Sequence, residues 1–286
     1  MAELNIPRVA IVGGESLIGR EIRELISSTM TPEPAAVLVS GEATSAKIAR
    51  DDEGEAIVLS PMNQETFATA RAVVLCGKPE STLRALELTG TRNTPLIDMT
   101  GGLEDKANAR LRAPVLEPCE LTPGDQNIHV IAHPAAIALG LFYARLASRW
   151  GIQRSVVNVF EPASERGQGG LHELQAQTVN LLSFKPLPKD VYDAQVGFNL
   201  LPTYGEEAPE ALEQSEARIE RHLATLLLMS SRAPMPSLRL VQAPVFHGYS
   251  VSAWVEFDQS PDPSDLEGAL ASAQMLALMR DAWHLG

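Results

Sequence analysis

The segment HVIAHPAAIALG, residues 129–140, has the pattern of a site that holds a nucleophile. A β-like run, His129–Ala132, is followed by Pro134, whose fixed φ suits the first turn of a helix, and then by strong helix formers. The free N–H groups and the dipole of a helix start stabilise negative charge, so a thiolate is well placed there. Yet residues 135–138 read AAIA, and none of these side chains can react.

A second candidate site follows the first predicted strand, in VAIVGGESLIGREI. Gly13 and Gly19 have the outer spacing of a dinucleotide-binding fingerprint, in which one glycine allows the tight turn and the other lets helix and strand pack closely. Ser16 occupies the place of the middle glycine, so a plain strand–helix turn explains the motif equally well. A hydrolase nucleophile elbow is excluded, because Ile18 stands where that motif needs glycine.

The remaining reactive residue types give no further site. Cys76 and Cys119 are too few for a disulfide framework, which favours a reducing cytoplasm, and both thiols are interpreted as packing or loop residues rather than catalysts. Four histidines lack the spacing of metal ligands: His129, His133, His172 and His247. We therefore expect no metal site.

The elements that must position these residues change character halfway along the chain. The first half reads as the strands Arg8–Val12, Ala36–Val39, Ala56–Leu59, Ala72–Cys76 and Leu96–Asp98. Between them lie the predicted helices Gly19–Ser28, Gln64–Ala70 and Glu80–Leu88. This alternation predicts an α/β class domain with a parallel sheet and right-handed crossovers, a Rossmann-like arrangement.

The second half predicts an α+β domain with a mixed or antiparallel sheet. Its predicted strands are Ser155–Phe160, Leu238–Pro244 and Tyr249–Phe257. Its predicted helices are Ala135–Trp150, Leu171–Leu182, Ala208–Met229 and Asp265–Trp283, with a glycine-rich turn, ERGQGG, before the second of them. We expect a dinucleotide-binding domain over residues 1–133, a second domain over 134–261, and a C-terminal helix within 262–286 that returns to the first domain.

Composition narrows the class of partner. A chain of 286 residues is long enough for two domains, and its net charge of −13 without a basic cluster disfavours nucleic acid. The longest apolar stretch, Val130–Leu146, is interrupted by His133, Pro134 and Arg145, which argues against a membrane span. The N-terminal residues lack the pattern of a secretory signal. A small molecule or another protein is the expected partner, in the cytoplasm.

Four segments together resemble the aspartate-semialdehyde dehydrogenase superfamily, and more closely its USG-1-type homologues. The first is the glycine turn, and the second is VIAHPAAIAL, which is similar to the family's ANPNCSTI-type segment. The third is ERGQGGLHELQAQTVNLL with QVGFNLLP, which is similar to the family's Gly-rich turn, helix and Q-x-x-F-N strand. The fourth is VQAPVFHGYSVSAWVE, which is similar to the family's R-V-P-V-x-x-G-H-S element. The resemblance covers nearly the whole chain. It implies a Rossmann-like domain that holds NADP and a C-terminal α+β domain that forms a homodimer interface and most of the active site.

In that family a cysteine thiolate attacks an aldehyde, a hydride passes to the cofactor, and phosphate resolves the thioester. The resemblance places the family's catalytic cysteine at Ala136, its glutamine at Glu161 and its histidine base at Tyr249. It places the arginine of R-V-P-V at Gln242 and the substrate-phosphate arginine at Glu104. None is intact. Alanine cannot form a thiohemiacetal, and a carboxylate repels the anion that an arginine would bind.

The resemblance also implies where a dinucleotide would bind. Its cofactor positions are Gly13, Ser16, Leu17, Ile18, Gly19, Ser40, Glu42 and Gly77. Glu42 lies near the family's arginine for the NADP 2′-phosphate, and a carboxylate suits a free 2′-hydroxyl, so NAD is slightly favoured over NADP. Lys47 or Lys78 could offset this preference. The family's carboxylate for a substrate amine matches Glu213 or Glu216.

These observations favour a homodimeric binding or regulatory protein without thiol-dependent activity, linked by analogy to amino-acid biosynthesis. The alternative is an NAD(P)-dependent oxidoreductase that acts on an aldehyde or oxo group by direct hydride transfer, which needs no covalent intermediate. Tyr249 or His247 would then donate the proton. A third interpretation is a purely structural role in assembly.

Overall fold

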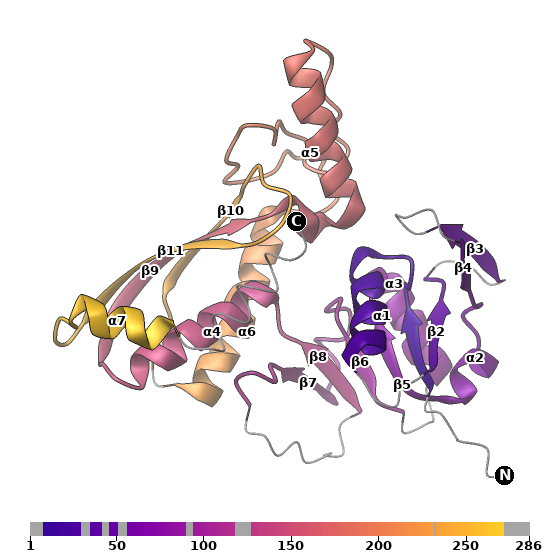
Figure 1. The fold of residues 1–286 in the computed structure, drawn as a ribbon, viewed down its shortest axis with the longest axis horizontal. Helices are drawn as coiled ribbons and strands as arrows, with labels where there is room; N and C mark the ends of the chain where they lie inside the picture. Colours follow the sequence, from indigo (N-terminus) through magenta and orange to yellow (C-terminus); the bar gives the residue numbers. More distant parts are fainter. Residues whose placement is uncertain are drawn as a thin grey trace. The chain divides into compact units, whose positions relative to one another are not determined.

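The computed structural model describes residues 8–29, 35–41, 46–50, 56–89, 94–117, 127–231 and 233–271. The chain forms two compact units that divide between Ala132 and His133, and the short segment 113–117 belongs to the second unit. Figure 1 shows the elements of both units. The division falls just before the helix that the opening motif predicts.

The first unit is built on a six-stranded sheet in which every neighbouring pair is parallel, in the order β2-β1-β5-β6-β8-β7. The strands are β1 (Arg8–Val12), β2 (Ala35–Val39), β5 (Ala70–Leu75), β6 (Leu96–Asp98), β7 (Ala109–Arg112) and β8 (Ile128–Ile131). The helices are α1 (Leu17–Thr29), α2 (Gln64–Ala68) and α3 (Pro79–Thr89). This confirms the predicted α/β class.

One predicted strand does not join this sheet. Residues Ala56–Leu59 form β4, which pairs antiparallel with β3 (Lys47–Arg50) in a separate two-stranded sheet. The side chains of β4 alternate in burial: Ile57 and Leu59 are buried, whereas Ala56 and Val58 are exposed. Such alternation suits a strand with one wet face rather than a strand buried inside a parallel sheet.

The second unit has the expected mixed sheet, with the central strand β9 (Ile152–Glu161) between a parallel β10 (Ser237–Gln242) and an antiparallel β11 (Ser250–Phe257). Around it are α4 (Pro134–Ala147), the 3₁₀ helix η1 (Ala163–Arg166), α5 (Gly167–Leu182), α6 (Leu212–Ser230) and α7 (Pro263–Leu270). Helices α4 and α6 pack together on one side of the sheet (Figure 1). Among the described helices, none is long and apolar enough to cross a membrane.

Two predictions about the second unit were wrong. The ERGQGG segment is not a turn: its first two residues end η1 and its glycines begin α5. A Cβ on Gly170 would lie 2.4 Å from the carbonyl oxygen of Ala163, so the close contact of η1 with α5 requires glycine there. The QVGFN segment is a loop rather than a strand, because the Gln177 side chain accepts the N–H groups of Val196 and Gly197.

The predicted C-terminal helix is shorter in the described part of the chain. Helix α7 ends at Leu270 and packs against α4 of the second unit. Residues 272–286 lie outside the described residues, so the return of this segment to the first unit stays a prediction.

Candidate functional site

The carboxyl ends of β9 and β10 meet at the candidate site. The strands run parallel, and their last residues, Glu161 and Gln242, are register partners that are both completely buried. Ala136 is also completely buried, in the first turn of α4, which packs against β9 and begins after the cap residue His133. Tyr249 precedes β11, and its ring lies edge-on to that of His133, with the centroids 5.9 Å apart. The second unit thus holds four of the five predicted degenerate positions.

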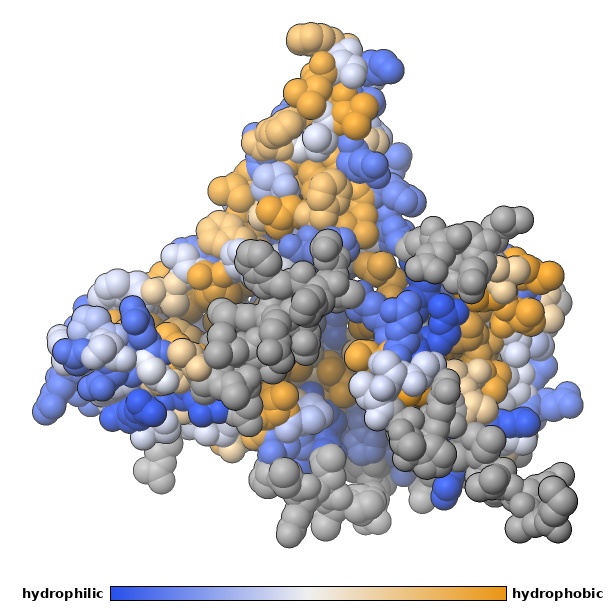
Figure 2. All heavy atoms as spheres, viewed as in Figure 1, coloured by the Kyte–Doolittle hydropathy of each residue, from blue (hydrophilic) through white to orange (hydrophobic). Residues whose placement is uncertain are grey.

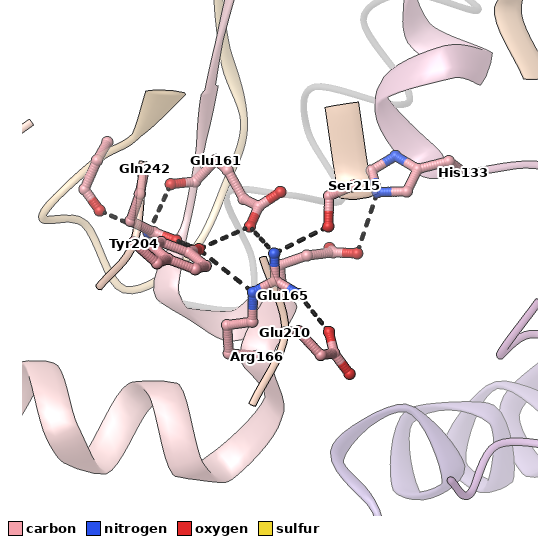
Figure 3. Close-up of polar contacts among 9 residues, drawn as sticks. His133, Glu161, Glu165, Arg166, Tyr204, Glu210, Ser215 and Gln242 are labelled. Atoms are coloured by element: carbon pink, nitrogen blue, oxygen red, sulfur yellow. Dashed lines mark hydrogen bonds and ion pairs between the residues drawn. The ribbon is translucent and has the colours of Figure 1, made fainter. Parts of the chain in front are cut away.

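Arg166 lies at the centre of the polar cluster, where its side chain is buried (Figure 3). The guanidinium donates Nε–H to the Tyr204 hydroxyl at 3.3 Å and Nη1–H to the Glu210 carboxylate. Nη2 donates to Glu161 Oε1 at 3.1 Å and to Ser215 Oγ at 2.8 Å. Because the guanidinium already has four acceptors from this chain, an anionic ligand would have to displace one of them.

Gln242, which the resemblance places at the family's substrate arginine, is also held by hydrogen bonds within the unit. Its Nε2 donates to the backbone carbonyls of Glu161 and Ala243, both at 2.9 Å. Its Oε1 accepts the Tyr204 hydroxyl at 2.6 Å. The amide is neutral and satisfied within the unit, so it supplies no positive charge to a ligand.

Glu161 is a buried acid with a strongly shifted pKa. Burial raises its pKa from 4.5 to about 7, with a smaller contribution in the same direction from Glu165, and against the opposing effects of Arg166 and Tyr204. Its Oε1 accepts from Arg166, whereas its Oε2 has no hydrogen-bond partner among the described residues. In Figure 3, Oε2 points away from Arg166, toward the side on which His133 lies. The buried Glu161 carboxyl thus has one oxygen that no hydrogen bond within the described residues satisfies.

His133 is held by the helix that it caps. Its Nδ1 accepts the N–H of Ala135 at 3.2 Å, and its Nε2 lies 3.2 Å from Glu165 Oε1, so the hydrogen bonds assign the ring proton to Nε2. Its backbone N–H donates to His222 Nδ1 at 2.9 Å. Burial alone would raise the pKa of Glu165, but His133, then Tyr249 and Arg166, outweigh it and lower that pKa to about 2.

The resemblance places Tyr249 at the family's histidine base, and the environment of this side chain opposes that role. Its hydroxyl oxygen is buried beside the Glu165 carboxylate. Burial, followed by the nearby carboxylates of Glu165 and Glu161, raises the pKa of this phenol well above its ordinary value. The hydroxyl therefore keeps its proton at neutral pH. His247 is exposed, in the loop between β10 and β11.

In the first unit, the glycine turn has the close backbone contacts of a nucleotide-binding turn. Gly13 has a φ of 76°, and a Cβ there would lie 2.5 Å from the Gly77 backbone. A Cβ on Gly19 would lie 2.4 Å from the Gly13 carbonyl oxygen. Ser16 Oγ accepts the Gly19 N–H at 3.1 Å, so the serine fills the middle position by capping the helix start.

The other predicted cofactor residues surround this turn. Leu17 and Ile18 begin α1, and Ser40 is buried at the end of β2. Glu42 lies outside the described residues. The carboxylate of Glu15 lies close to the residue before Glu42, because Glu15 Oε1 accepts the N–H of Gly41 at 3.1 Å.

The remaining predicted residues do not join the cluster. Glu104 belongs to the first unit, in the loop after β6. Glu216 bonds Arg239 and the N–H of Leu240, and Glu213 is exposed. Burial, and secondarily Asp98, raise the pKa of the Cys76 thiol to about 12, which agrees with its interpretation as a packing residue.

Sequence reasoning missed the cluster's central members. Glu165 and Arg166 lie four and five residues after Glu161 in EPASERG, and a charged pair this close to a strand end was an available signal. Tyr204 and Ser215 had no such signal, because they lie in a loop and a helix that only the fold brings to Arg166. Cys119 lies outside the described residues.

Comparison with known proteins gives a consistent picture. Residues 144–282 match the semialdehyde dehydrogenase dimerisation domain. A USG-1 protein homolog from Azotobacter vinelandii is 28% identical over 95% of this chain and 80% of its own length. An aspartate-semialdehyde dehydrogenase from Rickettsia bellii is 22% identical over 95% of this chain and 79% of its own length.

Two solved structures share the fold. A probable aspartate-semialdehyde dehydrogenase from Pseudomonas aeruginosa gives a TM-score of 0.79 at 21% identity, over 94% of this chain and 80% of its own. An aspartate-semialdehyde dehydrogenase with NADP from Candida albicans gives a TM-score of 0.63 at 13% identity, over 93% of this chain and 76% of its own. With its parallel-sheet unit, its match to the dimerisation domain and these relatives, the chain is similar over nearly its whole length to the aspartate-semialdehyde dehydrogenase superfamily, including a USG-1 homologue.

Proposed function

We propose that this protein has lost the thiol-dependent oxidation of its superfamily and acts as a homodimeric binding or regulatory protein that holds a nicotinamide dinucleotide in its first unit. One observation supports this most strongly: Ala136 is completely buried in the first turn of α4, at the nucleophile position. The surrounding side chains agree with it. Arg166 and Gln242 are satisfied by their own neighbours, and Tyr249 keeps its proton.

Direct hydride transfer, the alternative, has less support from the site. The buried Tyr249 hydroxyl has a strongly raised pKa and is a poor proton donor at neutral pH. His247 is exposed in a loop, where nothing in the described residues fixes its ring. Turnover of NADH or NADPH with a panel of carbonyl compounds by the purified protein would revive this alternative.

The glycine turn supports dinucleotide binding, and Glu15 supports a preference for NAD. Strand β2 lies beside β1, and the N–H group of Gly41 after β2 is already taken by the Glu15 carboxylate. In Rossmann-like folds an acidic side chain after the second strand binds the ribose 2′-hydroxyl and opposes a 2′-phosphate. We expect calorimetry to find micromolar affinity for NAD⁺ or NADH, with NADP⁺ and NADPH bound more weakly.

Replacing Glu15 by glutamine should strengthen NADP⁺ binding by about threefold to tenfold at low salt and leave NAD⁺ binding nearly unchanged, since one exposed charge is removed. The matched control is Glu24→Gln, which removes an exposed carboxylate on α1. Equal affinities for the two cofactors in the unmodified protein would contradict the assignment of Glu15. Absence of binding at millimolar concentrations of all four would contradict dinucleotide binding itself.

The open face of the second unit's sheet supports the homodimer. Along β9, Ser155, Val157 and Val159 are buried on the helix side, whereas Val156 is 46% exposed on the other face. Its register partner Trp254 on β11 is 53% exposed. Figure 2 shows further apolar surface over the projecting α5 region. Apolar patches of this kind mark protein–protein interfaces, and the matched domain is a dimerisation domain.

Trp254→Glu should therefore raise the dimer dissociation constant by about thirtyfold or more, because interfacial tryptophans commonly contribute at least about 2 kcal/mol. Sedimentation equilibrium measures this directly. Leu228→Glu is the control, since Leu228 is 88% exposed on α6, which covers the opposite side of the sheet. A dimer that is equally stable in both variants would place the interface elsewhere.

A further inference from the structure

The second half of α5 has buried polar and exposed apolar side chains. Glu173 and Gln177, one helical turn apart, are buried, whereas Val179 and Leu182 are exposed on the opposite face of the helix. A helix that covers only the core of its own chain shows the reverse preference. Figure 1 shows α5 projecting from the sheet of the second unit, and among the described helices and strands it packs mainly against η1. The apolar face of α5 is therefore turned outward.

The buried polar side chains of α5 hold the loop that follows the helix. The Gln177 amide makes four hydrogen bonds of 2.7–3.0 Å to the backbone of this loop, at Pro188, Ala194, Val196 and Gly197. The Glu173 carboxylate accepts two further backbone N–H groups, from Val191 and Tyr192. Phe198 and Leu200 come directly after this clamped stretch and are exposed. A fixed backbone thus presents both side chains, and such preorganisation lowers the entropy cost of binding.

Two phenylalanines of this region adopt a backbone conformation that favours glycine. Each described non-glycine residue with a positive φ lies between positions 184 and 198, and two of them are Phe184 at 54° and Phe198 at 63°. Phe184 follows α5 at the usual glycine position of a Schellman motif, in which the N–H of Lys185 donates to the Asn180 carbonyl at 2.9 Å. The Phe184 side chain is 98% exposed and that of Phe198 64%. The fold of one chain thus strains the backbone for two rings that it does not bury.

We propose that this surface, the α5 platform, anchors a second copy of the chain, with Phe184 and Phe198 as its main contacts. The inference rests on the proposed homodimer and adds a second anchoring surface to the sheet face around Trp254. The platform lies within the matched dimerisation domain, residues 144–282. Its charge also suits a second copy: residues 174–189 carry two exposed lysines, at positions 185 and 189, and no acid, in a chain of net charge −13. A locally basic surface attracts an acidic copy that the rest of the chain repels.

The experiment combines sedimentation equilibrium with urea unfolding of the full chain, for Phe184→Gly and Phe198→Gly. Each variant should raise the dimer dissociation constant about tenfold or more, since an aromatic anchor is lost from the interface. Unfolding is measured at a protein concentration far below the dissociation constant, so that it reports on the monomer. There the urea midpoint should stay the same or rise, because glycine adopts a positive φ without strain. A ring that packs within its own chain would give a lower midpoint instead.

The control is Leu228→Ala, which removes an exposed apolar side chain from α6 and should leave the dissociation constant unchanged. A monomeric unmodified protein throughout the micromolar range would overturn the homodimer and this inference together. A dimer that Trp254→Glu weakens but neither phenylalanine variant weakens would overturn the inference alone. Binding to neutral lipid vesicles that requires both phenylalanines, with unchanged dimerisation, would also overturn it and assign the α5 platform to a lipid surface.

Discussion

Arg166→Leu lowers the free energy of unfolding by about 3–5 kcal/mol at pH 8, which is the usual loss when one partner of a buried ion pair is removed. The reason is the completely buried Glu161 carboxylate, which accepts from the guanidinium at 3.1 Å. Among the described residues, the donor that then remains to this charge is the Tyr204 hydroxyl at 3.3 Å, which Gln242 Oε1 shares. Urea unfolding at fixed pH measures the change.

The loss should be smaller at pH 5, because Glu161 is then protonated in the folded protein and no buried charge is left unpaired. For the same reason, the double variant Arg166→Leu/Glu161→Gln should recover most of the loss at pH 8. The control is Arg154→Leu, whose salt bridge to Glu256 lies on the surface, where a pair contributes at most about 1 kcal/mol. Equal losses for Arg166→Leu and Arg154→Leu would contradict the description of the cluster.

Glu161→Gln makes the protein more stable above pH 7, by up to about 3 kcal/mol, which corresponds to the rise of the pKa from 4.5 to about 7. The sign follows from the direction of the shift. Since the folded protein holds this proton more tightly than the unfolded chain does, the native state is favoured by protonation below pH 4.5. That contribution is lost as the pH rises from 4.5 through 7.

Glutamine cannot ionise, and its amide oxygen can still accept from Arg166, so the variant should lack this decline. Chemical denaturation of both proteins at intervals from pH 4 to 8 gives the two profiles. Glu165→Gln serves as the contrasting variant, because the pKa of Glu165 is lowered to about 2 and its stabilising effect is lost only as the pH falls from 4.5 through 2. Parallel profiles for the unmodified protein and Glu161→Gln between pH 4.5 and 7 would show that Glu161 titrates normally.

Local patterns predicted the fold class and most of its elements. The β-like run before Pro134 forms β8, and the alanine-rich run after it forms α4, as expected. Close backbone contacts require glycine at positions 13 and 19 of the glycine turn. The positions that resemblance assigns to the catalytic residues stay predictions. The sequence did not reveal β4 as part of a hairpin, because a four-residue apolar run carries no information on its pairing direction.

The polar cluster itself could not be predicted, because its contacts join distant parts of the chain. Arg166 meets Tyr204, Glu210 and Ser215 across intervals of 38, 44 and 49 residues. Without those contacts, an arginine beside the site suggests a binding group for an anion. With them, the same arginine is a buried structural cation that compensates Glu161.

The central claim, that this site does not carry out thiol chemistry, has a direct test. Purified protein is given aspartate semialdehyde, phosphate and either NAD⁺ or NADP⁺ at pH 8, and formation of the reduced cofactor is followed at increasing protein concentration. The buried Ala136 and the satisfied Arg166 and Gln242 predict no rate above the protein-free background. A rate that requires phosphate and increases in proportion to protein concentration would contradict the account.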